Sequence, residues 1–256
     1  MNRIDQLFNQ KKGNILSIYF TAGFPALSDT VPILAALEAA GADMAEIGIP
    51  FSDPLADGPV IQQSSQRALE NGMSVARLFS QLEGIRQHLK MPLILMGYLN
   101  PILQFGMEKF LKTSAEIGID GVIIPDLPMD EYQEHYAPMF SRYGICPIML
   151  ITPQTPAERV QKLDSLSEGF LYMVSSASTT GTQKNPFSLH EDYFRKISAM
   201  KLRNPRMIGF GISNRQSFEQ ACSHAQGAII GTAFIKAIEK SQNLKASIHE
   251  FVSMIK

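Results

Sequence analysis

Two carboxylates, Glu46 and Asp57, stand in a stretch that runs from a short apolar segment into a proline-rich one. Residues 44–49 have the apolar and β-branched composition of a buried strand, and Glu46 is the carboxylate within it. A buried carboxyl without a counter-charge keeps its proton to a higher pH, which is the property that a general acid needs. The sequence therefore predicts an acid–base group on a rigid strand.

The second carboxylate lies on a loop. The strand should end at Pro50, and residues 51–59 are rich in proline, aspartate and glycine, a composition that predicts restricted backbone angles. Asp57 could therefore close over the same place as Glu46. A structural explanation stays open at this point: Glu46 could pair with a buried basic group, and Asp57 could cap the helix that begins near Pro59.

Eight apolar segments of strand length must position these groups. They alternate with helical segments at intervals of about 30 residues, the size of a βαβ unit. Eight such units predict a TIM (β/α)8 barrel in a single domain, residues 1–256, rather than two domains. An amphipathic segment at residues 4–8 is predicted to plug the bottom of the barrel as an extra N-terminal helix. The expected strands are residues 15–20, 44–49, 92–98, 121–124, 146–151, 170–174, 207–210 and 228–230.

The unusual residues of the chain fall at the carboxyl ends of these strands, where TIM barrels carry their active sites. We therefore expect them to converge on one mouth of the barrel. They are Glu46, the 51–59 loop, Tyr98, Pro125-Asp126, residues 175–183, Gly211 and Gly231.

Glycines follow the last two strands, as Gly209-Phe-Gly211 and Gly231-Thr232. They would let the backbone approach an oxyanion closely, and the helix beginning near Thr232 would point free N–H groups at it. This pattern predicts a phosphate site that needs no arginine. The alternative is that the glycines relieve crowding between strands.

Residues 175–183, after the sixth strand, are almost all small or hydroxylic. Such a segment has little to pack and many hydrogen-bond donors, so we expect a mobile lid. A plain solvated linker is the rival interpretation.

Composition excludes several classes of function. The chain has 256 residues, 45% of them hydrophobic, and its 23 basic and 24 acidic residues give a formal net charge of −1. No overall basic field exists to bind nucleic acid or an anionic membrane, so an anionic ligand must be bound by local groups.

Cysteine usage and the chain's hydropathy indicate the compartment. Cys146 and Cys222 form neither a disulfide framework nor a metal spacing, and they are expected to be inert core thiols in a reducing compartment. The N-terminus is polar, and no stretch approaches membrane-spanning length. The sequence is therefore interpreted as soluble and cytoplasmic.

The seventeen residues 46–62, Glu-Ile-Gly-Ile-Pro-Phe-Ser-Asp-Pro-Leu-Ala-Asp-Gly-Pro-Val-Ile-Gln, resemble the characteristic segment of the tryptophan synthase α subunit, the lyase that splits indole-3-glycerol phosphate. The resemblance covers nearly the whole chain. It includes residues 19–25, 125–128, Tyr172 with Thr180-Gly181, 209–213 and 227–232.

This resemblance implies a role for each matching residue. Glu46 would be the principal acid/base, and Asp57 would be its partner near the indole N–H, with Tyr172 close by. Thr180 would link the lid to Asp57. The apolar slot for the indole would be formed by Tyr19, Met96, Tyr98, Ile123, Leu150 and Phe210. The phosphate would be bound by Gly181, Gly211, Gly231 and Thr232.

The implied reaction is a retro-aldol cleavage that needs acid–base groups and no metal or organic cofactor in this chain. A pyridoxal-phosphate β subunit is the implied partner, in an α2β2 heterotetramer, and would face the barrel mouth. One departure from the family pattern is Ser178-Thr179, where Gly-Val is common, and it bears on lid closure more than on the reaction.

Two other functions stay open. Another phosphate-binding TIM-barrel lyase or isomerase of tryptophan or histidine biosynthesis would share the phosphate site without requiring the 51–59 loop. A catalytically impaired regulatory subunit would keep the fold and the partner surface.

Overall fold

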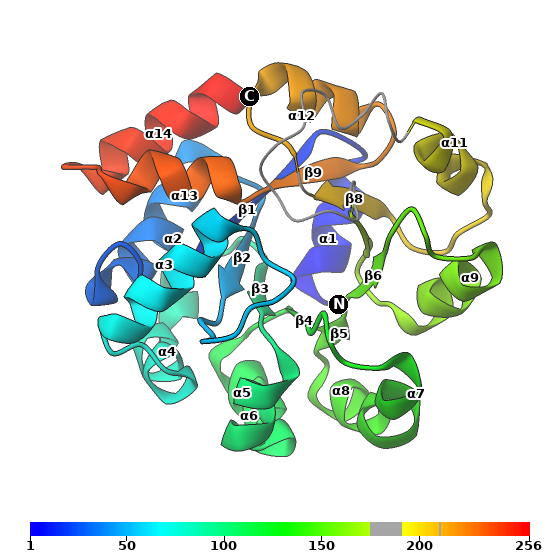
Figure 1. The fold of residues 1–256 in the computed structure, drawn as a ribbon, viewed down its shortest axis with the longest axis horizontal. Coiled ribbons are helices and arrows are strands. Elements are labelled where there is room, and N and C mark those ends of the chain that lie inside the picture. Colours follow the sequence, from blue (N-terminus) through cyan, green and yellow to red (C-terminus); the bar gives the residue numbers. More distant parts are fainter. Residues whose placement is uncertain (175–190, 210) are drawn as a thin grey trace.

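A nearly closed barrel of parallel strands forms the centre of the protein in the computed structural model, which describes residues 1–174, 191–209 and 211–256. The strand order in the described residues is β5-β4-β3-β2-β1-β9-β8-β7-β6 (Figure 1). The strands are β1 Ile15–Thr21, β2 Met44–Gly48, β3 Leu93–Met96, β4 Gly121–Ile123, β5 Cys146–Pro147, β6 Met149–Ile151, β7 Leu171–Val174, β8 Arg206–Gly209 and β9 Gly227–Ile230.

The barrel closes through the chain itself, because its two terminal strands, β5 and β6, are separated only by Ile148. The sequence predicts one continuous strand over residues 146–151, and here the structure differs. The first part pairs with β4 and the second with β7. Pro147 has no N–H to donate to a ladder, so the regular strand is interrupted beside it. The other predicted strands are present.

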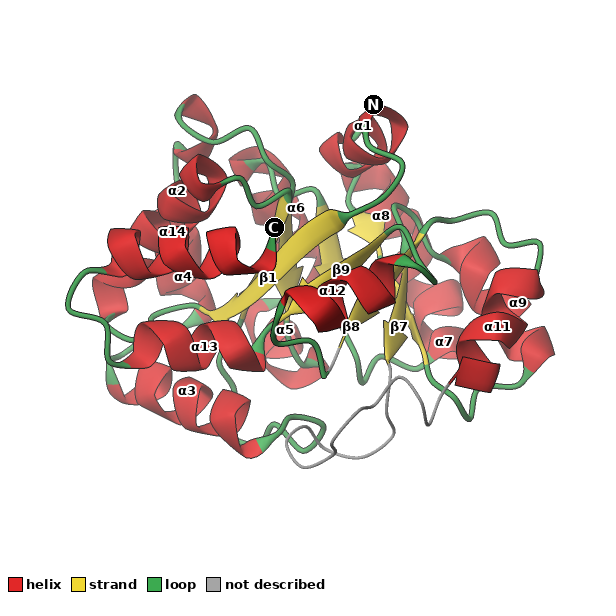
Figure 2. Cartoon of the chain, turned by 90° about the horizontal axis from the view of Figure 1, so that it is seen from above, coloured by secondary structure: helices red, strands yellow, loops and turns green. Residues whose placement is uncertain are grey.

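Helices cover the barrel: α1 lies at one end of it, and the others surround its outer side (Figure 2). Those of the described residues are α1 Arg3–Gln10, α2 Thr30–Ala40, α3 Pro59–Glu70, α4 Val75–Leu82, α5 Leu99–Phe105, α6 Met107–Ile117, α7 Met129–Glu131, α8 Ala137–Tyr143, α9 Ala157–Leu166, α11 Glu191–Ala199, α12 Arg215–Cys222, α13 Thr232–Glu239 and α14 Leu244–Ile255. Single turns occur at η1 Leu27–Asp29, η2 Ile85–Gln87 and η3 Tyr132–Tyr136. None of these helices is long and apolar enough to cross a membrane.

Strand side chains alternate between two cores, as the two-residue period of a strand requires. Leu16, Ile18 and Phe20 of β1 point outward to the helices, whereas Ile15 belongs to a separate cluster inside the barrel. The inner cluster also contains Ile4, Phe8, Met44, Ile94, Ile123, Cys146, Ile148, Phe170, Tyr172, Val174, Met207 and Ile229. The barrel is therefore filled by side chains and is not a pore.

Helix α1 plugs one end of the barrel, as predicted from the amphipathic segment at its start. Its two buried side chains, Ile4 and Phe8, join the inner cluster. Gly121 and Gly169 make room for Ile4, since a Cβ on either glycine would lie within about 3.0 Å of its side chain.

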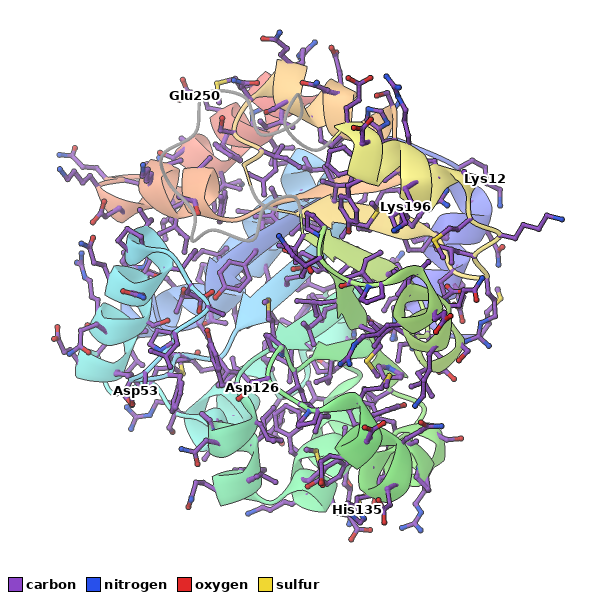
Figure 3. The ribbon with its side chains drawn as sticks, turned by 45° about the vertical axis from the view of Figure 1, so that its right-hand side comes forward. Lys12, Asp53, Asp126, His135, Lys196 and Glu250 are labelled. Carbon is purple, nitrogen blue, oxygen red and sulfur yellow. The ribbon has the colours of Figure 1, made fainter. Side chains whose placement is uncertain are left out.

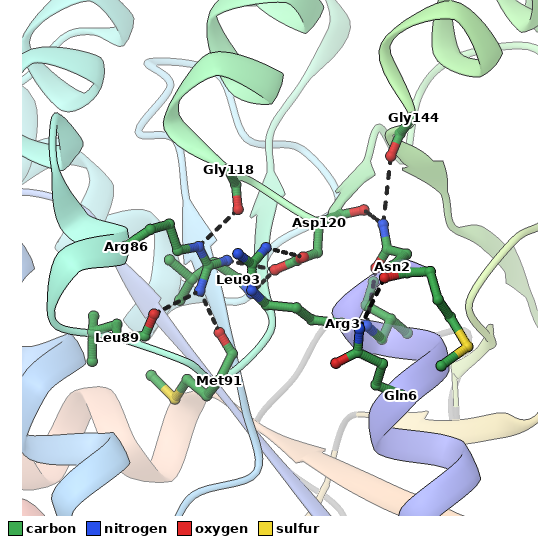
Figure 4. A network of polar contacts seen from close by, with 12 residues as sticks. Asn2, Arg3, Gln6, Arg86, Leu89, Met91, Leu93, Gly118, Asp120 and Gly144 are labelled. Atoms are coloured by element: carbon green, nitrogen blue, oxygen red, sulfur yellow. Dashed lines mark hydrogen bonds and ion pairs between the residues drawn. The ribbon is translucent and has the colours of Figure 1, made fainter.

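A polar network fastens this end of the molecule (Figure 4). The buried carboxylate of Asp120 accepts hydrogen bonds from Arg3 and Arg86 and from the N–H of Leu93. Arg86 also donates to the carbonyl oxygens of Gly118 and Met91. These contacts tie the N-terminal segment to the strand ends opposite the predicted active site.

Candidate active site

Most charged side chains lie on the outside of the molecule. The six labelled in Figure 3 are all exposed: Lys12, Asp53, Asp126, His135, Lys196 and Glu250. Among the described residues, the buried carboxylates are Glu46, Asp120 and Asp164. Asp120 has arginine partners, and Asp164 accepts backbone N–H groups from Arg203 and Asn204. Of these three buried carboxylates, Glu46 therefore has the fewest basic partners and hydrogen-bond donors.

Glu46 lies on β2, inside the barrel, and its side chain is 0% exposed. Its Oε1 accepts a hydrogen bond of 2.8 Å from the Ser17 hydroxyl, and its Oε2 has no hydrogen-bond partner among the described residues. No basic side chain of the described residues pairs with it. The alternative that Glu46 is neutralised by a buried basic group is therefore not what these residues show. Burial raises the pKa of Glu46 to about 8, against the smaller opposing effect of the Ser17 hydrogen bond.

Asp57 lies on the loop between β2 and α3, and Tyr98 holds it. The Tyr98 hydroxyl donates to Oδ2 of Asp57 at 3.1 Å and accepts the N–H of Ala56 at 3.1 Å. Helix α3 begins at Pro59 after Gly58, without a side-chain cap, so Asp57 does not cap it. Burial raises the pKa of Asp57 to about 6, and the hydrogen bond from Tyr98 opposes this rise.

A pocket of about 540 Å³ opens at the carboxyl ends of the strands, within the range of small-molecule sites. Its wall contains five of the predicted residues: Tyr19, Asp57, Met96, Tyr98 and Leu150. Three others, Glu46, Ile123 and Tyr172, are not part of this wall and belong to the buried barrel interior.

Two tyrosines, the half-buried Tyr19 and the buried Tyr172, lie near both carboxylates. Burial raises the pKa values of Tyr19 and Tyr172, and the charges of both Asp57 and Glu46 add to the rise in each case. The hydroxyls of the two tyrosines are therefore neutral at physiological pH. Since the charge of each carboxylate affects the pKa of each tyrosine, the four side chains form one electrostatic cluster.

Glycines leave space for these rings. A Cβ on Gly48 would lie 2.2 Å from the Tyr19 hydroxyl oxygen, and a Cβ on Gly209 would lie 2.2 Å from that of Tyr172. A Cβ on Gly231 would lie 3.1 Å from Cδ1 of Tyr19. Relief of crowding, which the sequence left open, therefore accounts for part of the glycine pattern.

The predicted phosphate residues that the structure describes follow β8 and β9. Gly211 is exposed and has a φ of 77°, which favours glycine. Gly231 precedes α13, and Thr232 is the first residue of that helix, whose first-turn N–H groups have no intrahelical acceptor. Thr180, Gly181, Phe210 and the 175–183 segment with Ser178-Thr179 lie outside the described residues.

Several residues at the pocket were not singled out from the sequence. The wall also includes Ser65, Thr152, Thr155 and Arg159. Thr152 follows β6 directly, so the rule that sites gather at the carboxyl ends of strands could have found it. A further polar group that was missed is Ser17, a buried hydroxyl on β1.

The two cysteines behave as expected for unreactive thiols. Cys146 is buried in the inner cluster and Cys222 is half-buried, and burial raises their pKa values to about 12 and about 11. In the part of the chain that the structure describes, no cluster of three or more His, Cys, Asp or Glu side chains could hold a metal ion.

A parallel barrel with a buried carboxyl and a second carboxyl at the ends of its strands defines a TIM-barrel enzyme equipped for acid–base chemistry. The chain belongs to the tryptophan synthase alpha chain family, a family of lyases, because the family model with the description Tryptophan synthase alpha chain matches residues 5–255. The predicted family is thereby confirmed.

Individual relatives agree with this assignment. The tryptophan synthase alpha chain of Flavobacterium johnsoniae is 56% identical over 256 residues, and that of Bacteroides thetaiotaomicron is 54% identical over 256 residues; in both cases all of each chain is covered. The crystal structure of tryptophan synthase subunit alpha from Legionella pneumophila has a TM-score of 0.89 at 36% identity, covering 100% of this chain and 97% of that one. The predicted TIM barrel is confirmed as well.

Proposed function

We propose that Glu46 and Asp57 are the catalytic pair with which this alpha chain cleaves indole-3-glycerol phosphate into indole and glyceraldehyde 3-phosphate. The observation that carries the proposal is the environment of Glu46, a fully buried carboxyl that has a single hydroxyl donor and no basic partner among the described residues. The alternative functions are not favoured by the family assignment.

The two carboxyls have different pKa values, as an acid and a charged partner require. With a pKa of about 8, Glu46 holds its proton at pH 7, whereas Asp57, with a pKa of about 6, is mostly ionised. Glu46 is therefore suited to donate a proton, and Asp57 is suited to stabilise positive charge on the indole nitrogen.

The proposed reaction uses a protonated Glu46 and an ionised Asp57. Glu46 protonates C3 of the indole, and the ring becomes an iminium-like electron sink. The bond between C3 and the hydroxyl-bearing carbon then breaks, its electron pair returns to the ring, and the hydroxyl proton passes to the Glu46 carboxylate as the aldehyde forms. Glu46 ends the cycle protonated, so no external acid, oxidant or metal takes part in these steps.

The indole would lie against the apolar residues of the pocket and the barrel interior, namely Tyr19, Met96, Tyr98, Ile123, Leu150 and Tyr172. The phosphate would lie at Gly211, Gly231 and Thr232, where backbone N–H groups and the positive end of α13 favour an anion. Contributions from Thr180, Gly181 and Phe210 stay predictions.

A β subunit is the proposed partner, in an α2β2 heterotetramer in which the partner carries the pyridoxal phosphate. Structures of tryptophan synthase from Mycobacterium tuberculosis resemble this chain, one with a TM-score of 0.89 at 26% identity. Leu55, on the 51–59 loop, is 86% exposed, and Leu103, on α5 beside Asn100-Pro101, is 46% exposed. Leu55 also lies in the pocket wall, so an apolar side chain is exposed at the mouth where the partner is proposed to bind. The cytoplasmic location expected from the sequence stays a prediction.

Indole release tests the proposal. The purified chain should release indole from indole-3-glycerol phosphate slowly alone and faster with a β subunit. Glu46→Gln keeps the shape and removes the proton, so it should lose at least about 100-fold in kcat. Asp57→Asn should also be impaired, whereas Asp130→Asn, at an exposed carboxylate that pairs with Lys162, should not be. Near-normal turnover by Glu46→Gln would refute the assignment.

A further inference from the structure

Ser17 is a polar side chain placed deep inside the barrel. It lies on β1, is 0% exposed, and is next to Met44 of β2 and Ile229 of β9 in the strand register. Both of these neighbours belong to the apolar inner cluster. A hydroxyl in such surroundings is costly unless it has a hydrogen-bond partner. The partner here is Glu46, whose Oε1 lies 2.8 Å from the Ser17 oxygen.

This hydrogen bond makes the two oxygens of Glu46 inequivalent. A serine hydroxyl has one proton to donate, and Oε1 receives it. When the carboxyl is protonated, an Oε1 that accepts from Ser17 is the carbonyl oxygen, and the proton resides on Oε2. Among the described residues, Oε2 has no hydrogen-bond partner, so its proton is not committed elsewhere in the protein.

We propose that Ser17 is a positioning residue for the cleavage reaction, which holds Oε1 of Glu46 so that Oε2 carries the proton that is given to the substrate. The inference rests on the proposed catalytic role of Glu46. Ser17 is not part of the pocket wall, so it acts through Glu46 and not on the substrate itself.

A merely structural role for Ser17 predicts different behaviour. If the hydroxyl only satisfied its own hydrogen-bonding need, removing it would change stability and leave the titration of Glu46 where it was. If it positions Glu46, removing it withdraws a donor that favours the ionised carboxylate, and the pKa of Glu46 rises further. The pH dependence of the reaction distinguishes the two roles.

The experiment compares Ser17→Thr with Ser17→Val, which have nearly the same shape and differ in the hydroxyl, and adds Ser17→Ala. For each full-length variant, kcat and kcat/KM for indole release from indole-3-glycerol phosphate are measured from pH 6 to pH 10, with Tm as a control for folding. The threonine and valine variants each add a methyl group to the packed core, so its steric cost is similar in both.

We expect the high-pH limb of kcat/KM to move up by about one pH unit in the valine and alanine variants, since a hydrogen bond to a charged group is lost. We also expect their kcat to fall about 10-fold at pH 7, with KM little changed, because the carboxyl is no longer held in one orientation. In Ser17→Thr, the high-pH limb of kcat/KM should stay at the wild-type pH, because the hydroxyl is kept.

Two results would overturn the inference: a limb that stays at the wild-type pH in Ser17→Val and Ser17→Ala, or one that moves equally in Ser17→Thr and Ser17→Val. Glu46→Gln, measured in parallel, separates this inference from the proposed function. If Glu46→Gln turns over normally, the catalytic role of Glu46 is wrong. If it is inactive while the serine variants keep the wild-type profile, only the role of Ser17 is wrong.

Discussion

Replacing Glu46 by glutamine should change the pH dependence of the protein's stability, which can be measured without substrate. The carboxyl has a pKa of about 8 in the folded chain, above the 4.5 of a free side chain. Between these values unfolding releases a proton. The contribution of Glu46 to the free energy of unfolding is therefore largest below pH 4.5, falls as pH rises, and levels off above pH 8.

The size of the effect follows from the burial of Glu46. Each rise of one pH unit in this range lowers the free energy of unfolding by about 1.4 kcal/mol. Through this carboxyl, the free energy of unfolding of the wild type should therefore fall by about 4 kcal/mol between pH 5 and pH 8. Glutamine does not titrate, and its carbonyl can still accept from Ser17. Its amide N–H₂ would be buried without a partner among the described residues, a cost of about 1–3 kcal/mol that does not depend on pH.

Urea unfolding of the wild type and Glu46→Gln at pH 5, 6, 7 and 8 measures this effect. Other titrating groups cancel in the difference between the two proteins, which should shift in favour of the variant by about 1.4 kcal/mol per pH unit. Glu116→Gln, at an exposed site on α6, is the matched control and should show no such trend. A difference that is flat from pH 5 to pH 8 would mean that Glu46 is ionised in the folded chain, and the assignment of a general acid would be wrong.

Two further predictions concern the groups around the pocket. Tyr98→Phe removes the hydroxyl that donates to Asp57, so the pKa of Asp57 should rise further above about 6, and the low-pH limb of indole release should move up by about one pH unit; an unchanged limb would show that the hydrogen bond is not made in solution. Gly48→Ala brings a Cβ to 2.2 Å from the Tyr19 hydroxyl oxygen, so it should destabilise the chain by about 1–3 kcal/mol in urea unfolding and lower indole release. Gly13→Ala has nothing within 4 Å and is its control; equal effects of the two substitutions would contradict the packing around Tyr19.

Local patterns in the sequence predict the barrel because each unit is specified by neighbouring residues. Apolar runs, helix-ending glycines such as Gly41, and the amphipathic start of the chain indicate their structures without knowledge of distant contacts. Which single residue forms a helix cap is harder to predict from the sequence. Ser213 with Gln216 suggests a capping box, whereas Asn214 and Ser217 form it in the structure. Both segments offer a hydroxyl or amide at the required spacing, so composition does not choose between them.

The candidate site is predictable only in part, since its decisive contacts join distant residues. The chemistry of Glu46 could be inferred from its place in an apolar strand. Its hydrogen bond to Ser17 depends on the register of β1 against β2, and the bond from Tyr98 to Asp57 depends on how a loop folds over a neighbouring strand end. Gly231 shows a further limit, because a phosphate site and a close tyrosine ring would both favour glycine there.

The most direct test of the account is a crystal structure with a non-cleavable indole-3-alkyl phosphate that lacks the hydroxyl at the carbon to be released. It should show C3 of the indole about 3–3.5 Å from Oε2 of Glu46, as proton transfer requires, the ring nitrogen beside Asp57, and the phosphate at the N–H groups of Gly231 and Thr232. An indole held in the outer pocket with Tyr19 between it and Glu46, or a phosphate bound away from α13, would contradict the account.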